Sequence, residues 1–386
     1  MYQTRDEHLF GPGPKRILAL DGGGIRGALT LGYLAEIETI LRDRVGGDPD
    51  FRLCDYFDLI GGTSTGSIIA AGLAMGLSVA ELAVMYQALG ADVFQSSAFR
   101  FGLIGAKFPK EPLVQALQAN FGDETLGSDK LRTGLVVMTK RLDTGSPWLL
   151  HNNPRGRYFG PDPVTGTPGN SELLLRDVVR ASTAAPHYFE PELITLGPGL
   201  TGAFVDGGVS PYNNPALQML MMATCGGYQL NWPFGAERLL LVSAGTGHRG
   251  LKLPPDEVMG MPAVQLAAQS ILSIMEDANW LGQSILQWMA DSPTSWPIDG
   301  EIGDLRSDSF GGPAMITYQR YEVLLEPDWL ADTLGVHLTD DQCAELTAMD
   351  NPANARRLAD LGVTAAKVQV DPSHLPASFD IDAVAR

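Results

Sequence analysis

Short apolar runs alternate with longer amphipathic segments over the first two thirds of the chain. The short runs are typical of buried strands and lie at 16–20, 56–61, 133–140 and 238–243. The longer segments have a helical period and lie at 28–44, 67–76, 79–89, 113–121 and 173–180. Strands that alternate with helices predict an α/β fold, in which a mainly parallel central sheet carries helices on both faces.

The pattern changes beyond residue 250. Three helices and one strand are expected there, the helices at 262–291, 340–346 and 352–361 and the strand at 318–325. We therefore divide the chain into an α/β core over 14–250 and a mainly helical C-terminal region over 251–386. That region is expected to pack on the core, and the sequence indicates no role for it.

Composition places the chain among globular proteins, since 45% of its 386 residues are hydrophobic and 19% are charged. The formal net charge of −18 argues against a nucleic-acid polymer as partner, because phosphate binding needs a basic face. Three scattered cysteines indicate a reducing compartment and suggest neither a disulfide framework nor a metal cluster. Without a secretory signal pattern or a long apolar window, we expect a cytoplasmic protein.

The first motif with chemical content is GTSTG at 62–66, which lies directly behind an apolar run. A strand, a tight turn and a helix form the setting in which a serine is held on a strained elbow with its hydroxyl exposed. Gly62 and Gly66 remove Cβ atoms where the turn folds back on itself. We interpret Ser64 as a nucleophile. A structural turn is the alternative, because glycine-flanked serines arise easily in a chain with 44 glycines.

The second motif is DGGGIRG at 21–27, between the first strand and the first helix. It matches the G-x-G-x-x-G fingerprint of dinucleotide-binding proteins at Gly22, Gly24 and Gly27. That use requires an acidic residue at the end of the next strand, and here the strand leads into Ser64. We therefore favour an oxyanion hole made by backbone N–H groups of Gly22, Gly23 and Gly24, with the charge of Arg26 nearby.

The third motif is Asp206-Gly207-Gly208, after a short apolar strand. Taken alone it is typical of an Asp-Gly turn, but beside the other two motifs Asp206 becomes a candidate general base. His248 follows in the order Ser, Asp, His that hydrolases with this elbow use, and His187 lies in a segment expected near the site. A structural or surface role is the usual one for such histidines, and we expect neither to be catalytic.

In their order along the chain, DGGGIRG, GTSTG and DGG resemble the motifs of the patatin-like phospholipase family. RASTAAPHYFEP at 180–191 and LLLVSAGTG at 239–247 support the resemblance, which covers about 14–250. It implies a three-layer α/β/α sandwich that hydrolyses lipid acyl esters without a metal or other cofactor. It also implies Ser64 as nucleophile, Asp206 as base and the Gly22–Gly24 loop with Arg26 as the oxyanion-binding element.

A dyad of serine and aspartate has to work without an imidazole. A free Asp has a pKa near 3.9, so as a base at neutral pH it gives up about 4 kcal/mol relative to a group with a pKa of 7. Burial beside an apolar strand can recover part of this by raising the pKa, and one oxyanion donor contributes about 2.7–4 kcal/mol. The glycine loop is therefore as important to the prediction as Asp206.

An enzyme that acts on a lipid or phospholipid has to reach its substrate at a membrane surface. Aromatic, apolar and basic residues mix at 94–110. Core packing is the usual role of such aromatic residues, and a lid or membrane-contacting loop is the alternative: Phe94, Phe99, Arg100, Phe101, Leu103, Ile104, Lys107, Phe108 and Lys110. The helix at 262–291 is expected to pack on the core, with an oligomer surface as its alternative role.

The sequence thus predicts a serine lipid acyl hydrolase of patatin type with peripheral membrane contact. One alternative is an effector of the same family whose activity is gated by a small nucleotide signal, as the resemblance allows. The other is a dinucleotide-binding oxidoreductase that uses the glycine loop.

Overall fold

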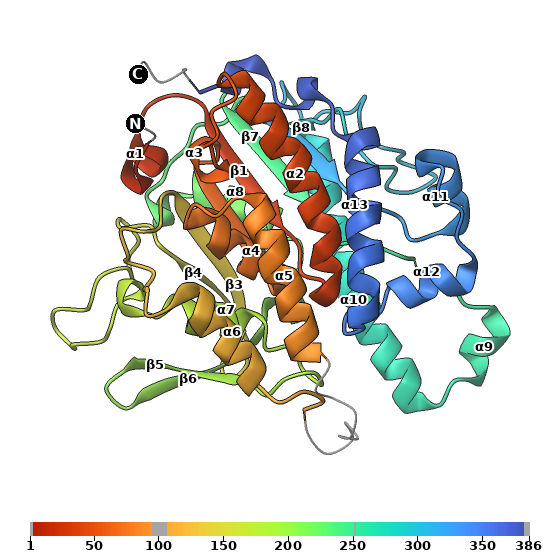
Figure 1. The fold of residues 1–386 in the computed structure, drawn as a ribbon, viewed down its shortest axis with the longest axis horizontal. Helices are drawn as coiled ribbons and strands as arrows, with labels where there is room; N and C mark the ends of the chain where they lie inside the picture. Colours follow the sequence, from red (N-terminus) through yellow and green to blue (C-terminus); the bar gives the residue numbers. More distant parts are fainter. Residues whose placement is uncertain (1–2, 95–105, 251, 382–386) are drawn as a thin grey trace.

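The computed structural model describes residues 3–94, 106–250 and 252–381. Its centre is one sheet in the order β5-β6-β3-β2-β1-β7-β9-β8, with β4 as a further partner of β3 (Figure 1). The strands are β1 Lys15–Leu20, β2 Leu59–Thr63, β3 Gly134–Arg141, β4 Ser146–His151, β5 Glu192–Gly197, β6 Leu200–Asp206, β7 Leu239–Ala244, β8 Ala290–Asp291 and β9 Ile316–Tyr321.

Parallel pairing dominates this sheet. It joins β3 to β2, β2 to β1, β1 to β7, β7 to β9 and β9 to β8, while β4, β5 and β6 pair antiparallel. Leu20 at the end of β1 lies opposite Gly62 at the end of β2. The loops that follow these two strands therefore lie at the same edge of the sheet, where α/β proteins place their functional groups.

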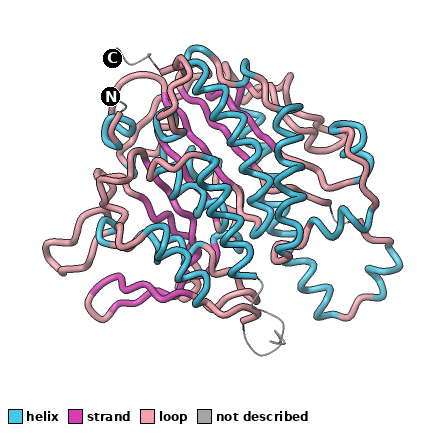
Figure 2. The backbone as a smooth tube through the Cα atoms, in the orientation of Figure 1, coloured by secondary structure: helices cyan, strands magenta, loops and turns pink. Residues whose placement is uncertain are grey.

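Helices flank the sheet on both faces (Figure 2). They are α1 Arg5–Phe10, α2 Gly27–Arg44, α3 Leu53–Tyr56, α4 Thr65–Ala74, α5 Val79–Phe94, α6 Glu111–Phe121, α7 Leu175–Ser182, α8 Ala216–Thr224, α9 Pro255–Gly260, α10 Ala263–Met289, α11 Pro327–Leu334, α12 Asp340–Leu346 and α13 Ala355–Gln369. None of the helices within the described ranges is long and apolar enough to cross a membrane.

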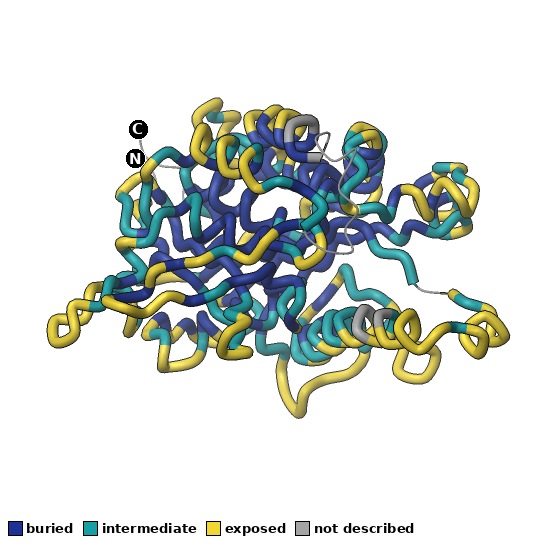
Figure 3. The backbone as a smooth tube through the Cα atoms, turned by 90° about the horizontal axis from the view of Figure 1, so that it is seen from below, coloured by how far each residue is buried: buried dark blue, intermediate teal, exposed yellow. Residues whose placement is uncertain are grey.

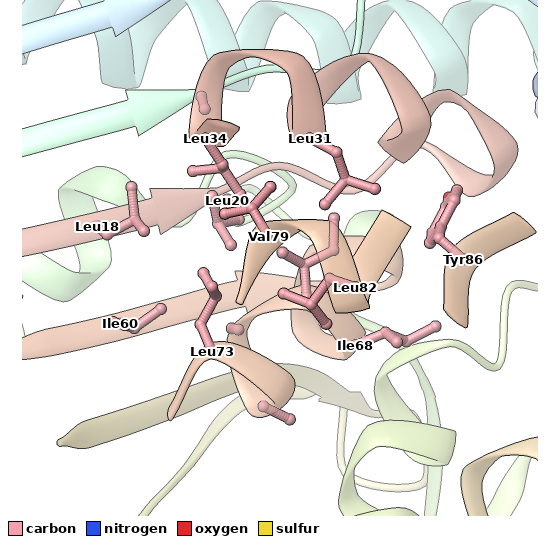
Figure 4. Close-up of a cluster of buried hydrophobic side chains, with 14 of the residues drawn as sticks. Leu18, Leu20, Leu31, Leu34, Ile60, Ile68, Leu73, Val79, Leu82 and Tyr86 are labelled. Atoms are coloured by element: carbon pink, nitrogen blue, oxygen red, sulfur yellow. The ribbon is translucent and has the colours of Figure 1, made fainter. Parts of the chain in front are cut away.

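Two hydrophobic cores show that the fold has three layers. Side chains alternate between the two faces of a strand, and in β1 Leu18 and Leu20 join one core while Ile17 and Ala19 join the other. Figure 4 shows part of the first core, where leucines of α2, α4 and α5 pack on β1 and β2. Side chains of α8 and of the end of α10 fill the second core. The protein is the α/β/α sandwich that the sequence predicts.

Two predicted strands have different bounds in the structure. The run at 56–61 becomes strand only from Leu59, because 53–56 form the short helix α3. Tyr56 and Phe57 are buried all the same, and an apolar run alone does not distinguish a buried helical turn from a strand. The strand expected at 318–325 is β9, which begins and ends earlier.

Residues after 250 contribute to the central sheet and to its helical layers. β9 pairs with β7, and α13 lies beside α2 on one face of the sheet (Figure 1). Two glycines allow the helices to approach so closely. A Cβ on Gly32 would overlap the backbone of Gly362, and a Cβ on Gly362 would overlap the carbonyl of Leu29.

The central strands β1, β2, β7 and β9 are buried, whereas α9, one side of α10, several loops and the turn of the β5–β6 hairpin are exposed (Figure 3). Most of the aromatic segment expected at 94–110 lies outside the described residues. Of its described part, Phe108 is buried and packs against Tyr188 and Phe189, as expected for core packing. Lys107 forms an ion pair with Asp350.

We expect Gly362→Ala to destabilise the protein by about 1–3 kcal/mol, the usual cost of forcing atoms into a filled interface. Alanine favours a helix over glycine by about 1 kcal/mol, so a loss of stability would report the clash with α2. Urea unfolding measures the change. Gly300→Ala is the control, since no atom lies within 4 Å of a Cβ added there. Equal effects of the two substitutions would contradict the role assigned to the contact.

Candidate active site

Ser64 lies between the end of β2 and the start of α4 with a φ of 53° and a ψ of −124°. A non-glycine residue with positive φ is strained, and such strain concentrates at functional sites. The flanking glycines make the turn possible. A Cβ on Gly62 would overlap Gly66, and a Cβ on Gly66 would overlap the carbonyl of Leu20. The turn therefore has the geometry of a nucleophile elbow.

Two other serines hold this elbow. The N–H of Ser64 donates to Oγ of Ser182 at 2.9 Å, and the hydroxyl of Ser182 donates to the carbonyl of Met138 at 2.6 Å. The hydroxyl of Ser67 donates to the carbonyl of Ser64 at 2.6 Å. The sequence analysis did not single out either serine, although Ser182 belongs to the RASTAAP segment that supported the family resemblance.

Asp206 ends β6 and reaches the same edge of the sheet because it pairs with Thr139 of β3. Its carboxylate accepts a hydrogen bond of 2.7 Å from the N–H of Gly208, and the side chain of Ser64 is near enough to lower the pKa of this carboxyl. A Cβ on Gly207 would come 2.5 Å from the carbonyl oxygen of Met138, so the chain needs glycine directly behind the aspartate. The structure thus brings Ser64 and Asp206 together.

The surroundings of Asp206 change its acidity. Burial raises the pKa of its carboxyl to about 6, against the opposing effects of the hydrogen bonds from Ser64 and Gly208 and of the charge of Arg180. The carboxyl is thus mainly ionised at neutral pH and is a stronger base than a free aspartate.

The loop at 21–27 follows β1 and is fixed by segments that are distant in sequence. The N–H of Gly22 donates to the carbonyl of Asn213 at 3.1 Å, and the hydroxyl of Thr246 donates to the carbonyl of Gly22 at 3.1 Å. The N–H of Ile25 donates to the carbonyl of Met349 at 2.8 Å. The loop is therefore fixed by hydrogen bonds to three segments, around Asn213, Thr246 and Met349.

Two amides of this loop remain available. The N–H groups of Gly23 and Gly24 have no hydrogen-bond acceptor among the described residues, and both glycines line the pocket that contains Ser64. Gly24 has a φ of 57°, which favours glycine. Free backbone N–H groups beside a nucleophile can stabilise an oxyanion.

Arg26 occupies a different place from these amides. Its guanidinium donates to the carbonyl of Gly247 at 2.9 Å and lines a second cavity rather than the Ser64 pocket. Gly22 lines that second cavity as well. Gly27 begins α2, where a Cβ would come 2.6 Å from Oγ1 of Thr65. Of the five predicted loop residues, Gly23 and Gly24 line the Ser64 pocket. Gly22 also lies beside Ser64, since a Cβ added to it would come 3.2 Å from Cβ of Ser64.

A buried ion network lies behind the loop and was not predicted from the sequence. Arg320 at the end of β9 donates to both carboxylate oxygens of Asp21, at 3.0 and 2.7 Å, and to Glu322 at 2.7 Å. Burial opposes the charge of Arg320, but Asp21 and Glu322 outweigh it and raise its pKa. Glu322 in turn accepts a hydrogen bond of 2.8 Å from the N–H of Gly247. The sequence did contain a signal for this network, because the strand segment YQRYEVLL at 318–325 places Arg320 and Glu322 among apolar and aromatic residues.

The cavity at Ser64 has a volume of about 240 Å³ and mostly apolar walls. Its apolar lining comes from helices and loops on one side of the sheet and includes Ile68, Leu89, Val93, Leu113, Phe189 and Val209. Ser64, Asp206, Gly23 and Gly24 are among the polar and glycine residues that line the same cavity. The mostly apolar lining suits an apolar group that presents a polar bond to Ser64.

Neither of the two histidines considered lies at this centre. Nε2 of His248 is 2.9 Å from a carboxylate oxygen of Glu276, and His248 lines the second cavity. His187 is exposed, with a φ of 76°. Within the described ranges, the interactions that shift the pKa of Asp206 include no histidine.

The chain belongs to the patatin-like phospholipase family, whose family model matches residues 18–220. The resemblance that the sequence motifs carry is thereby confirmed. A cGAMP-activated phospholipase of Vibrio cholerae is 34% identical over 52% of this chain and 55% of its own length. One from Escherichia coli is 36% identical over 52% and 53%. Patatin group J-1 of Solanum tuberosum is 29% identical over 60% of each chain.

The chain thus spans only about half the length of the curated relatives it matches. Among solved structures, VipD from Legionella pneumophila aligns with 90% of this chain and 67% of its own at 14% identity and a TM-score of 0.37.

We expect the carboxyl of Asp206 to titrate near pH 6, because it is buried. Carbon-13 NMR of protein labelled at the aspartate carboxyls measures this, with Asp206→Asn to assign the signal. Arg180→Gln removes a positive charge that lowers this pKa, so the midpoint should move to higher pH. A midpoint near 4 in the unsubstituted protein would contradict the expected effect of burial.

Proposed function

We propose that this protein is a serine acyl hydrolase that cleaves lipid acyl esters with a dyad of Ser64 and Asp206. The proposal rests on one observation above all: a serine on a strained elbow lines the same pocket as a buried aspartate whose pKa is raised to about 6. The Ser64 hydroxyl attacks the ester carbonyl while Asp206 takes its proton. Protonated Asp206 then returns that proton to the leaving alcohol. Water, activated by the same carboxylate, hydrolyses the acyl-enzyme and releases the fatty acid.

A free aspartate is a weak base at neutral pH, which is the main objection to a dyad without histidine. The raised pKa of Asp206 reduces this deficit. A pKa of about 6 in place of 3.8 recovers roughly 3 kcal/mol of the driving force that a free aspartate lacks, at 1.36 kcal/mol per pKa unit. The free N–H groups of Gly23 and Gly24 are suited to hold the oxyanion, and each such donor is worth about 2.7–4 kcal/mol. Together these contributions are of the size that acyl transfer needs.

An apolar pocket supports a fatty acyl chain as the group that is recognised. Its walls carry aliphatic and aromatic side chains, and Ser64 and Asp206 are among the residues that line it. Met259 on α9 and Val264 and Ile274 on α10 are exposed, and such side chains are suited to lie against a lipid surface. We do not propose the dinucleotide-binding alternative, because β2 leads into Ser64 where ribose recognition needs an acidic residue.

The test of this function uses the wild type, Ser64→Ala and Asp206→Asn with a fluorophosphonate probe, p-nitrophenyl esters and phospholipid vesicles. Ser64→Ala should abolish labelling and hydrolysis. Asp206→Asn should lower kcat by 100-fold or more, the usual worth of a general base. Asp299→Asn, at an exposed carboxylate, is the matched control and should leave both unchanged. Labelling that persists in Ser64→Ala would overturn the mechanism.

We propose as a second property that cGAMP raises this activity, because two relatives at 34% and 36% identity are cGAMP-activated phospholipases. Allosteric coupling of typical size, about 1–3 kcal/mol, predicts a 5- to 150-fold increase in hydrolysis at saturating cGAMP. The rate of p-nitrophenyl ester hydrolysis measures it, with Ser64→Ala as the blank. If the protein reacts with the probe and hydrolyses esters but its rate does not change with cGAMP, activation by cGAMP is refuted and the hydrolase function stands.

A further inference from the structure

We propose that a second cavity, on the other side of the glycine loop from Ser64, is a binding site for a nucleotide. This cavity, the polar cleft, has a volume of about 380 Å³ and lies between the glycine loop, the ends of β7 and β9, and α10. It continues into a hollow of about 680 Å³ that has several walls in common with it, among them His248, Trp280, Trp296 and Arg320. The two hollows form one continuous site, with arginines in the polar cleft and tryptophans in the larger hollow.

Two guanidinium groups give the polar cleft its affinity for an anion. Arg26 lines it and has no carboxylate within ion-pair distance among the described residues, since its hydrogen bonds go to carbonyls. Arg320 is only 6% exposed, and its Nε has no hydrogen-bond partner in the described part of the chain. A buried N–H without an acceptor is costly, and a phosphate oxygen is a strong acceptor for it.

The carboxylates of the polar cleft are already engaged. Asp21 and Glu322 accept hydrogen bonds from Arg320. Glu276 pairs with His248. In the adjoining larger hollow, a carboxylate of Glu326 pairs with Lys252. Two carboxylates thus share the guanidinium of Arg320. The charges of Glu322 and Asp21 also act on Arg26, which pairs with neither among the described residues and can therefore meet a phosphate.

Aromatic rings provide the other half of nucleotide recognition. Trp280 borders both hollows, and the rings of Trp296 and Trp329 stack at 5.7 Å in the larger one. Trp280 is only partly buried, and it has His248 at its edge at 5.9 Å. Planar bases stack on exposed aromatic faces whatever their identity. We therefore place the base near Trp280 and the phosphate near Arg26.

The polar cleft is in contact with the Ser64 pocket through side chains that line both. Asn213, Met275 and Met349 belong to both sets of walls. The carbonyl of Met349 holds the N–H of Ile25, and Gly22 is itself a wall of the polar cleft. A nucleotide that shifts these groups changes the geometry of the free amides of Gly23 and Gly24. This regulatory part rests on the proposed hydrolase function, whereas binding itself does not.

Binding is tested in Ser64→Ala protein, so that the result does not depend on catalysis. Calorimetry with cGAMP, GMP, AMP and inorganic phosphate compares this protein with the additional substitutions Trp280→Ala, Trp280→Phe and Trp288→Ala. We expect Trp280→Ala to weaken cGAMP binding about tenfold or more, and Trp280→Phe to weaken it less because a ring remains. Trp288, on the same helix but packed on Phe310, is the control and should have no effect.

The outcomes separate the binding site from the hydrolase. No binding of any nucleotide, or equal binding in folded Trp280→Phe, Trp280→Ala and Trp288→Ala, overturns the site. Inorganic phosphate that binds as tightly as the nucleotides overturns the base position. Binding that depends on Trp280 in a protein that neither labels nor hydrolyses supports the site and refutes the hydrolase. Binding that depends on Trp280 with a wild-type hydrolysis rate unchanged by the nucleotide overturns the regulatory part.

Discussion

The candidate active site depends on a backbone approach that side chains would prevent. The first turn of α4 packs against the end of β1, where a Cβ on Gly66 would overlap the carbonyl of Leu20. Because β1 and β2 are adjacent and parallel, this contact places the elbow beside the glycine loop. Without it, Ser64 and the free amides of Gly23 and Gly24 would not line one pocket.

Burial has two effects at this centre. It raises the pKa of Asp206, which makes the carboxylate a better base at neutral pH. A low local dielectric also strengthens the interaction between backbone N–H groups and a developing negative charge. Burying a carboxyl costs folding free energy, and the fold offsets part of this cost with the hydrogen bonds from Ser64 and Gly208.

Residues outside the region matched by the family model complete the surroundings of the site. The match ends at 220, whereas β7, β9 and the segment around Met349 come later. Arg320 and Glu322 hold Asp21 and Gly247, and the carbonyl of Met349 holds Ile25. The glycine loop, near the start of the chain, is therefore fixed by contacts with residues near its end.

The sequence alone determined the α/β class, the three motifs and the order of most strands and helices, because hydrophobic periodicity and glycine-rich turns are local signals. It also pointed to Ser64 and Asp206, which line the same pocket in the structure. Only the tertiary structure decided that Arg26 lines a separate cleft, that Ser182 holds the elbow and that β9 brings Arg320 to Asp21. These contacts join residues that are far apart in the chain. Strand pairing across the sheet brings them together, and no local sequence pattern encodes that pairing.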